Sequence, residues 1–207
     1  MRYRAVLFDI GGVVVGSPLE AIAAYERELG IEPGLINRVV VGTGAAGGWS
    51  RLERGELTLE QFYPAFERDC EGAGCRISAR MLMGRVAEAT VPRPAMLDAI
   101  RRIRANGFLA AAVTNNWLTE EDGGSSVLRV HFDAFIESAV LGLRKPDPRI
   151  FEIACETLRI TPPEAVLLDD IGVNLKSARA LGMTTIKVVD PETALAELEA
   201  VLGFPLR

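Results

Sequence analysis

The sequence predicts an α/β protein with a mainly parallel sheet and a small helical unit inserted after the first strand. Four short apolar runs have the length of buried strands; they cover residues 5–8, 108–113, 165–168 and 184–189. Stretches with helical periodicity lie around and between the later runs, at 94–105, 148–159, 172–181 and 191–202. Alternating strands and helices indicate right-handed βαβ units. Residues 17–91 show helical periodicity without strand alternation, so they are expected to form the inserted unit.

Each apolar run ends at a recognisable boundary. The run AVLF stops at Asp9, and Gly11 and Gly12 follow as turn residues. The second run leads into Thr114, Asn115 and Asn116, the third into Asp169 and Asp170, and the fourth into Asp190. Ligands of open α/β sheets bind at the carboxyl ends of the strands. The sequence therefore predicts that polar groups from several strands meet at one edge of the sheet.

The inserted unit is expected to contain helices at 19–29, 33–40, 58–71 and 78–89. Pro92 and Pro94 suit a linker that enters a helix at its first turn. The predicted domains are therefore a core formed by residues 1–16 and 92–207, and a helical domain formed by residues 17–91.

Composition excludes several classes of function. The chain has 207 residues, a net charge of −5 and one histidine. An acidic chain is a poor partner for nucleic acid, whose phosphates require a basic surface. A single histidine excludes two-histidine zinc and iron sites within one chain. Any chemistry must therefore rest mainly on carboxylates, lysine or backbone groups.

The same composition favours a cytoplasmic protein. No apolar run reaches the ~18 residues of a membrane helix, and Asp9 interrupts the N-terminal run too early for a signal peptide. The three cysteines lack the CxxC spacing of a redox or zinc pair and are expected to be reduced. We expect no membrane partner.

The polar strand ends suggest one kind of chemistry. A strand-end carboxylate such as Asp9, close to further carboxylates and a lysine, can serve as a nucleophile or bind Mg²⁺. A threonine hydroxyl followed by amides, as in Thr114-Asn115-Asn116, can donate hydrogen bonds to an anion. Lys145 precedes Pro146 on a stiff extended turn and is suited to pairing with an anion. Any one of these features alone is equally typical of a turn or a helix cap.

Taken together and in order, four segments resemble the haloacid dehalogenase superfamily of aspartate-nucleophile hydrolases. They are FDIGGV from Phe8, TNN from Thr114, GLRKPDP from Gly142 and LDDIGVN from Leu168. The resemblance covers almost the whole chain. It is most pronounced toward the N-terminal phosphatase domain of soluble epoxide hydrolase and the related domain fused to some acyl-CoA dehydrogenases. It implies a Rossmann-like core with a helical cap inserted after the first strand.

The resemblance also implies a role for each site residue. Asp9 would form an aspartyl-phosphate, Thr114 would hydrogen-bond the phosphoryl oxygens together with Asn115 and Asn116, and Lys145 would neutralise the transferring group. Mg²⁺ would be held by Asp9, Asp170 and the backbone carbonyl of Gly11. Asp169 and Asn174 would support them. The expected substrate is a small phosphorylated metabolite.

One position departs from the family. Phosphatases of this superfamily carry a second aspartate two residues after the nucleophile, where it serves as general acid and then general base; this chain has Gly11. Glycine keeps the backbone carbonyl and loses the proton shuttle. Loss of a general acid–base costs about 10²–10⁴-fold in rate, or roughly 3–5 kcal/mol. Substrates with good leaving groups, such as acyl or aryl phosphates, would be affected least.

Other interpretations follow from the same glycine. Dehalogenases of the superfamily also lack the second aspartate, but they usually lack an acidic pair such as Asp169-Asp170. Phosphonatases need a lysine in the cap, and residues 17–91 contain none. A non-catalytic module that binds Mg²⁺ and a phosphorylated or acyl ligand is the main alternative. A receiver domain is shorter and has no inserted cap.

Several further patterns have simpler explanations. GTGAAG at 42–47 matches a dinucleotide-binding motif, but no second strand follows it; we expect a flexible cap loop facing the active site. Trp49 and Arg51 could contact substrate from that loop, although packing and solvation are the simpler roles. His131, at the approach to a strand, is expected to be structural. The arginines at 101, 102 and 104 are expected to form a solvated helix face, and residues 123–126 a loop.

Overall fold

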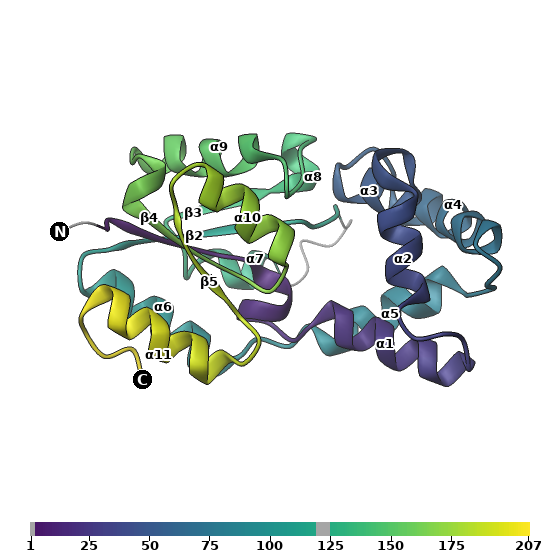
Figure 1. Ribbon diagram of the computed structural model, residues 1–207, viewed down its shortest axis with the longest axis horizontal. Helices are drawn as coiled ribbons and strands as arrows, with labels where there is room; N and C mark the ends of the chain where they lie inside the picture. Colours follow the sequence, from purple (N-terminus) through teal and green to yellow (C-terminus); the bar gives the residue numbers. More distant parts are fainter. Residues whose placement is uncertain (1–2, 119–124) are drawn as a thin grey trace.

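Five parallel strands form one sheet in the order β3-β2-β1-β4-β5. The computed structural model describes residues 3–118 and 125–207 (Figure 1). β1 lies in the middle, with Ala5 paired to Leu109 of β2 on one side and to Ala165 of β4 on the other. The strands are β1 (Ala5–Phe8), β2 (Leu109–Thr114), β3 (Ala134–Glu137), β4 (Ala165–Asp169) and β5 (Thr184–Lys187). The parallel α/β fold class expected from the sequence is confirmed.

Only β1 has the bounds of its predicted run; β4, for example, extends one residue beyond its run, to Asp169. β3 was not among the four predicted runs, because it has only four residues and its first two are only half-buried. β2 extends one residue further, to Thr114, which pairs with Glu137. β5 ends at Lys187, two residues before the end of its apolar run.

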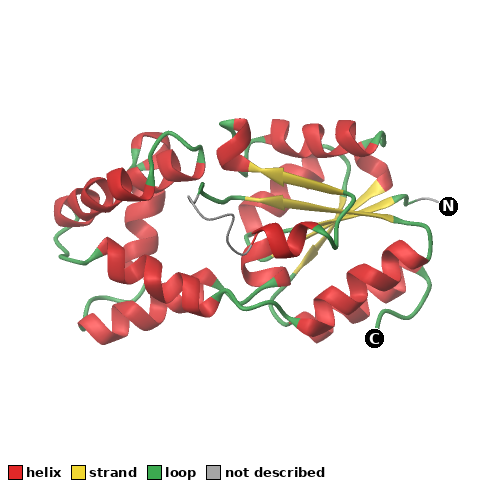
Figure 2. Ribbon diagram, turned by 180° about the vertical axis from the view of Figure 1, so that it is seen from behind, coloured by secondary structure: helices red, strands yellow, loops and turns green. Residues whose placement is uncertain are grey.

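Two helical layers cover the sheet (Figure 2). On one face, α6 (Pro94–Ala105) and α11 (Pro191–Leu202) pack against residues such as Val6, Phe8 and Val166. On the other face, α9 (Pro148–Leu158) and α10 (Gly172–Ala180) pack against Leu7 and Leu167. Successive strand residues therefore enter opposite cores, as the two-residue period of a strand requires. Both faces are buried, which explains why the strands read as continuous apolar runs.

Five helices form a second cluster, here called the helical lobe, between β1 and α6 (Figure 1). They are α1 (Pro18–Leu29), α2 (Leu35–Gly42), α3 (Gly48–Glu53), α4 (Leu59–Gly72) and α5 (Ala79–Ala89). Side chains of Ser17, Thr58 and Ser78 cap the first turns of α1, α4 and α5, as expected for these residue types. The lobe has its own core, which includes Tyr25, Ile36, Leu52, Phe62, Phe66 and Leu82.

α3 differs from the prediction. Residues 42–47 were expected to form a flexible loop, but α2 continues to Gly42, a short turn η2 (Gly44–Ala46) follows, and α3 begins at Gly48. The helix is short and lies between glycines, so its periodicity is hidden in the sequence. It is held by tertiary contacts, including the carboxylate of Asp69, which accepts a hydrogen bond from the Gly48 N–H at 2.7 Å.

The two chain segments that join the helical lobe to the sheet run side by side. Val15 and Pro92 form an antiparallel bridge, and the Gly16 N–H donates to the Val91 carbonyl at 3.0 Å. A Cβ atom on Gly16 would lie 2.0 Å from the Ala89 carbonyl oxygen. Glycine at this position therefore allows the two segments to approach closely.

Short elements complete the described chain. η1 (Ile10–Val14) follows β1, α8 (Ser138–Leu141) follows β3, and η3 (Pro162–Glu164) precedes β4. Of the loop predicted at 123–126, Gly123 and Gly124 lie outside the described residues, and Ser125 begins α7 (Ser125–Arg129). Among residues 3–118 and 125–207, no helix has the length and apolar character needed to cross a membrane.

The lobe's aromatic core gives a stability prediction. Phe62 is fully buried, stacks on Phe66 with ring centroids 5.2 Å apart and contacts the edge of Trp49. Phe62→Ala is expected to lower the free energy of unfolding by about 3–5 kcal/mol through lost burial and cavity formation. Met81→Ala, at a side chain that is 57% exposed in the same lobe, should change it by less than about 0.5 kcal/mol. Urea denaturation of both variants checks this, and equal losses would contradict the packing described.

Candidate active site

Asp9 lies at the carboxyl end of the central strand, where the chain turns through η1. The Oδ1 atom of Asp9 accepts a hydrogen bond from the Ile10 N–H at 2.6 Å, which fixes the carboxylate at the strand end. The turn continues through Gly12, whose φ is +79°. A Cβ atom on Gly12 would lie 2.3 Å from Oδ2 of Asp170. Glycine at 12 therefore allows both the backbone conformation and the close approach of Asp170.

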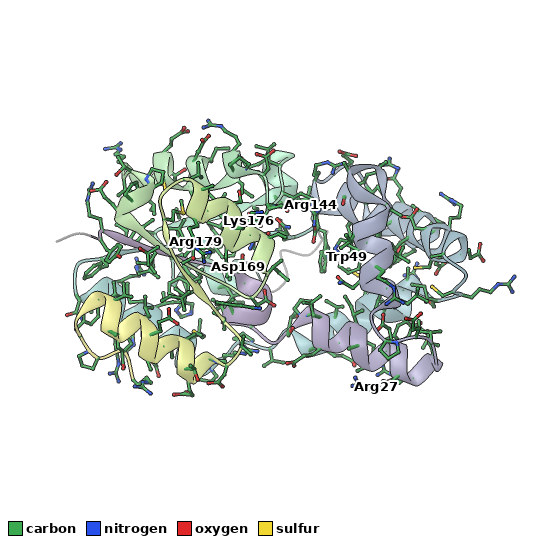
Figure 3. All side chains as sticks on the ribbon, viewed as in Figure 1. Arg27, Trp49, Arg144, Asp169, Lys176 and Arg179 are labelled. Atoms are coloured by element: carbon green, nitrogen blue, oxygen red, sulfur yellow. The ribbon has the colours of Figure 1, made fainter. Side chains whose placement is uncertain are left out.

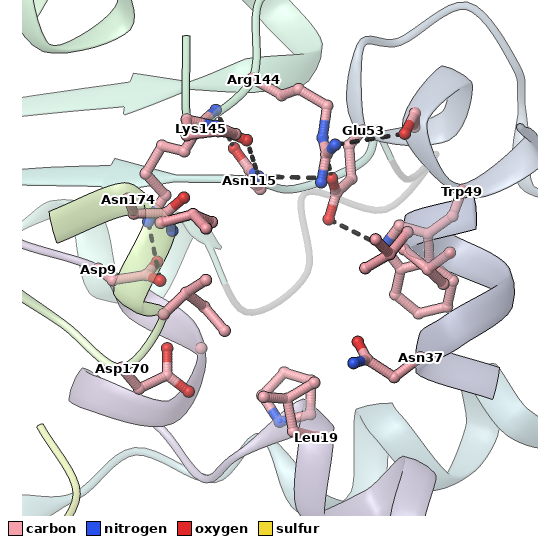
Figure 4. Close-up of a pocket in the computed structure, with 18 of the residues that line it drawn as sticks. Asp9, Leu19, Asn37, Trp49, Glu53, Asn115, Arg144, Lys145, Asp170 and Asn174 are labelled. Atoms are coloured by element: carbon pink, nitrogen blue, oxygen red, sulfur yellow. Dashed lines mark hydrogen bonds and ion pairs between the residues drawn. The ribbon is translucent and has the colours of Figure 1, made fainter. Parts of the chain in front are cut away.

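Three carboxylates and one ammonium meet at this edge of the sheet; Figure 4 shows Asp9, Asp170 and Lys145 among them. Oxygen atoms of Asp9, Asp169 and Asp170 lie within 4.8 Å of one another. The Nζ atom of Lys145 is 2.8 Å from Oδ2 of Asp9 and 2.8 Å from Oδ2 of Asp169, and the lysine is only 1% exposed. Asn174 also donates to both carboxylate oxygens of Asp169. The structure thus brings together five of the predicted site residues.

Burial and mutual repulsion shape the charge state of these groups. Burial raises the pKa of Asp9, and Asp169 adds to the rise while Lys145 opposes it. Burial, followed by the charge of Asp169, raises the pKa of Asp170 to about 6. Burial disfavours the charge on Lys145, but Asp9 and Asp169 outweigh it and raise its pKa. Three carboxylates with one ammonium leave an excess of negative charge, which favours binding of a cation.

The side chains of Thr114, Asn115 and Asn116, at the end of β2, lie in different surroundings. Thr114 is buried at the end of β2. Asn115 lines the cavity, and its side chain holds the Lys145 backbone. The Asn115 Oδ1 atom accepts from the Lys145 N–H at 2.8 Å, and its Nδ2 atom donates to the Lys145 carbonyl at 3.1 Å. The Asn116 side chain points toward Glu137 and Ala139 instead. Its Nδ2 atom donates to Glu137 at 2.8 Å and its Oδ1 atom accepts from the Ala139 N–H, so the structure places its side chain on β3 and α8.

A cavity of about 360 Å³ opens above Asp9, between the sheet edge and the helical lobe. Its volume is in the range of small-molecule sites. Its base is polar and includes Asp9, Gly11, Asp170, Lys145 and Asn174. Most of the helical lobe's lining is apolar and comes from Pro18, Leu19, Ile22, Val40, Val41 and Trp49.

Two charged residues in the cavity wall were not predicted from the sequence. Glu53 of α3 is 7% exposed, and its Oε2 atom accepts from Nε of Arg144 at 2.5 Å. Arg144 also donates to the Ser50 hydroxyl at 3.3 Å. Figure 3 shows Arg144 and Trp49 on opposite sides of the junction between the two parts of the molecule. Arg144 precedes Lys145 in the chain, but Glu53 has no sequence signal, because its place depends on how the lobe docks.

The remaining patterns have structural roles. Trp49 lines the cavity and also packs on Phe66, with ring centroids 5.3 Å apart. Arg51 pairs with Glu56 at the surface. The backbone of His131 bonds to Leu128 and Arg104, and residues 42–47 provide Gly44 to the cavity wall.

The helix-face arginines have polar partners. Arg101 pairs with Asp98 and Arg104 with Asp133, while Arg102 donates to the Arg207 carbonyl. The three cysteines, Cys70, Cys75 and Cys155, are buried and free of disulfide bonds.

Several proteins of known sequence align with most or all of this chain. It is 41% identical over 208 residues to acyl-CoA dehydrogenase family member 10 of Mus musculus, covering 99% of this chain and 20% of that protein. It is 37% identical over 222 residues to bifunctional epoxide hydrolase 2 of Sus scrofa, covering 100% and 40%. A phosphoglycolate phosphatase of Chromobacterium violaceum is 28% identical over 89% of this chain and 84% of its own. The chain thus spans less than half the length of the first two relatives.

Solved structures share the fold. A HAD-like family hydrolase of Porphyromonas gingivalis superposes with a TM-score of 0.70 at 19% identity, covering 98% of both chains. A HAD family enzyme of Bacteroides thetaiotaomicron in complex with magnesium and inorganic phosphate gives 0.61 at 20% identity, covering 89% of this chain and 93% of that one. The family model of haloacid dehalogenase-like hydrolases matches residues 3–182. This match spans most of the chain, which therefore belongs to the haloacid dehalogenase-like hydrolases.

Proposed function

We propose that this hydrolase is a Mg²⁺-dependent phosphatase that acts on a small phosphorylated metabolite through an aspartyl-phosphate on Asp9. The observation that carries the proposal is the position of Asp9 at the base of the cavity, 2.8 Å from a buried lysine and beside Asp170. A carboxylate with these neighbours suits nucleophilic attack on phosphorus, because a cation and an ammonium can offset the charge of the transferring group.

The donor set fits Mg²⁺. Hard carboxylate and carbonyl oxygens are the ligands this ion prefers, and Asp9, Gly11 and Asp170 all line the cavity base. Both oxygens of Asp169 are already engaged by Lys145, Asn174 and the Ile171 N–H, so we assign Asp169 a supporting role. Bound Mg²⁺ would neutralise charge on the phosphoryl oxygens. The complex of the Bacteroides enzyme with magnesium and phosphate supports this assignment by its fold.

The chain's own groups would divide the work of phosphoryl transfer. The Ile10 N–H holds the Asp9 carboxylate, which attacks phosphorus as the bond to the leaving oxygen breaks. Lys145 stays charged and offsets the developing negative charge. The Thr114 hydroxyl and the backbone N–H of Asn115 would orient the phosphoryl group, because the Asn115 amide is engaged by Lys145 and Glu53. Water would then release phosphate and regenerate Asp9.

Gly11 restricts the leaving groups that this site can serve. No side chain at position 11 can protonate the departing oxygen, so the reaction favours phosphates whose leaving group needs no proton, such as acyl or aryl phosphates. The apolar wall formed by Leu19, Ile22, Val41 and Trp49 favours a substrate whose organic part is apolar.

A cap role for the helical lobe completes this proposal. The lobe provides the apolar wall, while the sheet edge provides the polar base. We therefore assign residues 17–91 to the cap domain, and residues 1–16 and 92–207 to the catalytic core.

Gly11 also supports a second candidate, a module that binds a phosphorylated ligand without turnover. Fluoroberyllate, which mimics a phosphoryl group on an aspartate, separates the two candidates. Calorimetric binding of Mg²⁺ and phosphate together with no turnover and no fluoroberyllate complex at Asp9 would favour the binding module.

The first prediction from the proposed function tests Asp9 as the nucleophile. Asp9→Asn is expected to lower turnover of aryl and acyl phosphates by at least about 10³-fold, because a nucleophile acts as part of a unit whose loss is not compensated. Asp98→Asn makes the same exchange at an exposed aspartate paired with Arg101 and should keep the parental rate. Phosphate release assays measure both. Equal turnover of the parent and Asp9→Asn would exclude the proposed mechanism.

The second prediction restores the missing acid. The backbone at Gly11 (φ −65°, ψ 127°) suits any residue, but a Cβ atom would lie 3.0 Å from Cγ of Pro18. In a Pro18→Ala background, Gly11→Asp is expected to raise alkyl phosphate turnover by about 10–10²-fold, within the range of general acid catalysis. Gly11→Asn has the same volume without the acid and should give no gain. Similar rates for both variants would show that proton donation at position 11 does not limit the reaction.

The third prediction tests Asp170 as a metal ligand. With its pKa raised from 3.8 to about 6, Asp170 binds its proton more tightly in the folded state. In a chelator, the contribution of Asp170 to the free energy of unfolding should therefore fall as the pH rises from about 4 to about 6. Mg²⁺ favours the charged carboxylates and should reduce this fall. Asp170→Asn should show a shallower pH dependence and a weaker response to Mg²⁺ in urea denaturation; a variant indistinguishable from the parent would remove Asp170 from the metal site.

A further inference from the structure

Glu53 connects the helical lobe to the sheet edge through a buried carboxylate. Within the lobe, its Oε1 atom accepts from Nε1 of Trp49 at 2.9 Å. Toward the sheet edge, its Oε2 atom accepts from Nε of Arg144 at 2.5 Å and from Nδ2 of Asn115 at 3.4 Å (Figure 4). Both carboxylate oxygens are therefore occupied by donors, and the donors come from both parts of the molecule.

The two partners at the sheet edge act on the same residue. Arg144 precedes Lys145 in the chain, and Asn115 holds the Lys145 main chain by both its N–H and its carbonyl. At the other end of the lysine, Nζ lies between Asp9 and Asp169. A continuous series of hydrogen bonds thus runs from Trp49 through Glu53 and Asn115 to the backbone that carries the ammonium beside Asp9.

The end of α3 is seated closely on α8. Gly55, two residues after Glu53, has a φ of +69°, and a Cβ atom on it would lie 2.3 Å from the Ala139 carbonyl oxygen. Close packing of this kind has few alternative arrangements. The place of Glu53 therefore depends on the seating of the lobe against α8.

We propose that Glu53 is a positioning residue through which the helical lobe sets the place of Lys145 beside Asp9. When α3 is seated on α8, the Glu53 carboxylate orients Arg144 and Asn115, and these two hold the lysine backbone. Docking of the lobe then both encloses a substrate and places Lys145 beside Asp9, as in enzymes whose closure assembles the catalytic groups. The kinetic consequence rests on the proposed phosphatase function, whereas the structural consequence does not.

Lysine labelling gives a readout that needs no turnover. The chain has three lysines, and Lys176 and Lys187 are exposed while Lys145 is buried. With ¹³C-labelled lysine, Glu53→Gln at a fixed pH is expected to shift or broaden the Lys145 side-chain signal and leave the other two unchanged. The control is Glu56→Gln, at a surface residue paired with Arg51 and Arg54, which should move none of the three. An unmoved Lys145 signal in a folded Glu53→Gln protein would overturn the proposal.

Kinetics with an aryl phosphate distinguish positioning from substrate binding. Glu53→Gln is expected to lower kcat by about 10- to 100-fold, the range typical when a group supporting a metal or catalytic residue is removed, with KM nearly unchanged. A rise in KM with unchanged kcat would assign Glu53 to substrate binding and contradict the proposal. If the parent itself shows no Asp9-dependent turnover, the phosphatase proposal fails, while the lysine signals still decide this one.

A second variant moves the lobe without altering Glu53. Gly55→Ala places a methyl group against the Ala139 carbonyl and is expected to displace α3, shift the Lys145 signal and lower kcat in the same way. Gly74→Ala, at a position in the same lobe that also has a positive φ (+83°) but open space around it, is the matched control. A folded Gly55→Ala protein with the parental lysine spectrum and parental kcat would show that the packing of α3 on α8 does not affect the position of Lys145.

Discussion

The buried ammonium of Lys145 is the interaction on which the candidate site depends. Oxygen atoms of three carboxylates within 4.8 Å of one another repel strongly where water is scarce. Lys145 binds two of them directly, and removal of such a partner would leave buried charge without compensation. The surrounding hydrogen bonds from Asn174, Ile10 and Ile171 hold the carboxylates in place. The site therefore keeps its geometry while retaining an excess of negative charge, which favours a cation.

The strand order places these charges together. From β1 the chain goes to β2 and β3 on one side, and it then crosses to β4 and β5 on the other. Ligands of open α/β sheets bind where the order reverses, at the carboxyl ends of the strands. Asp9 follows β1, and Asp169 and Asp170 lie at the end of β4, so the topology alone brings residues 160 positions apart to one edge. The glycine at 12 then allows Asp170 to approach the first turn.

The parts of the site that the sequence predicted are those set by strand ends. Asp9 and Asp169-Asp170 follow apolar runs, and the parallel sheet brings them together, whereas Lys145 was predicted from the turn before Pro146 and lies between α8 and α9. Asn115 and Asn116 read as one amide pair, but the structure places only Asn115 in the cavity, because successive residues of an extended chain point to opposite sides. Glu53 and Arg144 meet across the junction of two units, and no local pattern encodes that docking. β3 has only three consecutive apolar residues and was not among the predicted apolar runs, and α3 is a short helix that begins at a glycine and is held by contacts within the lobe.

The carboxylates of the cavity explain why Gly11 bears on the choice of substrate. Among the described residues that line it, the carboxyl groups belong to Asp9, Glu53 and Asp170. Under the proposed mechanism, Asp9 is consumed as the nucleophile and Asp170 holds the metal, while Glu53 receives hydrogen bonds from Trp49, Arg144 and Asn115. Each of these carboxyl groups thus has another role, and His131 is not among the residues that line the cavity. A leaving group that departs as a stable anion needs no acid, and for such a substrate the carboxylate, the lysine and the metal suffice for transfer of the phosphoryl group to Asp9.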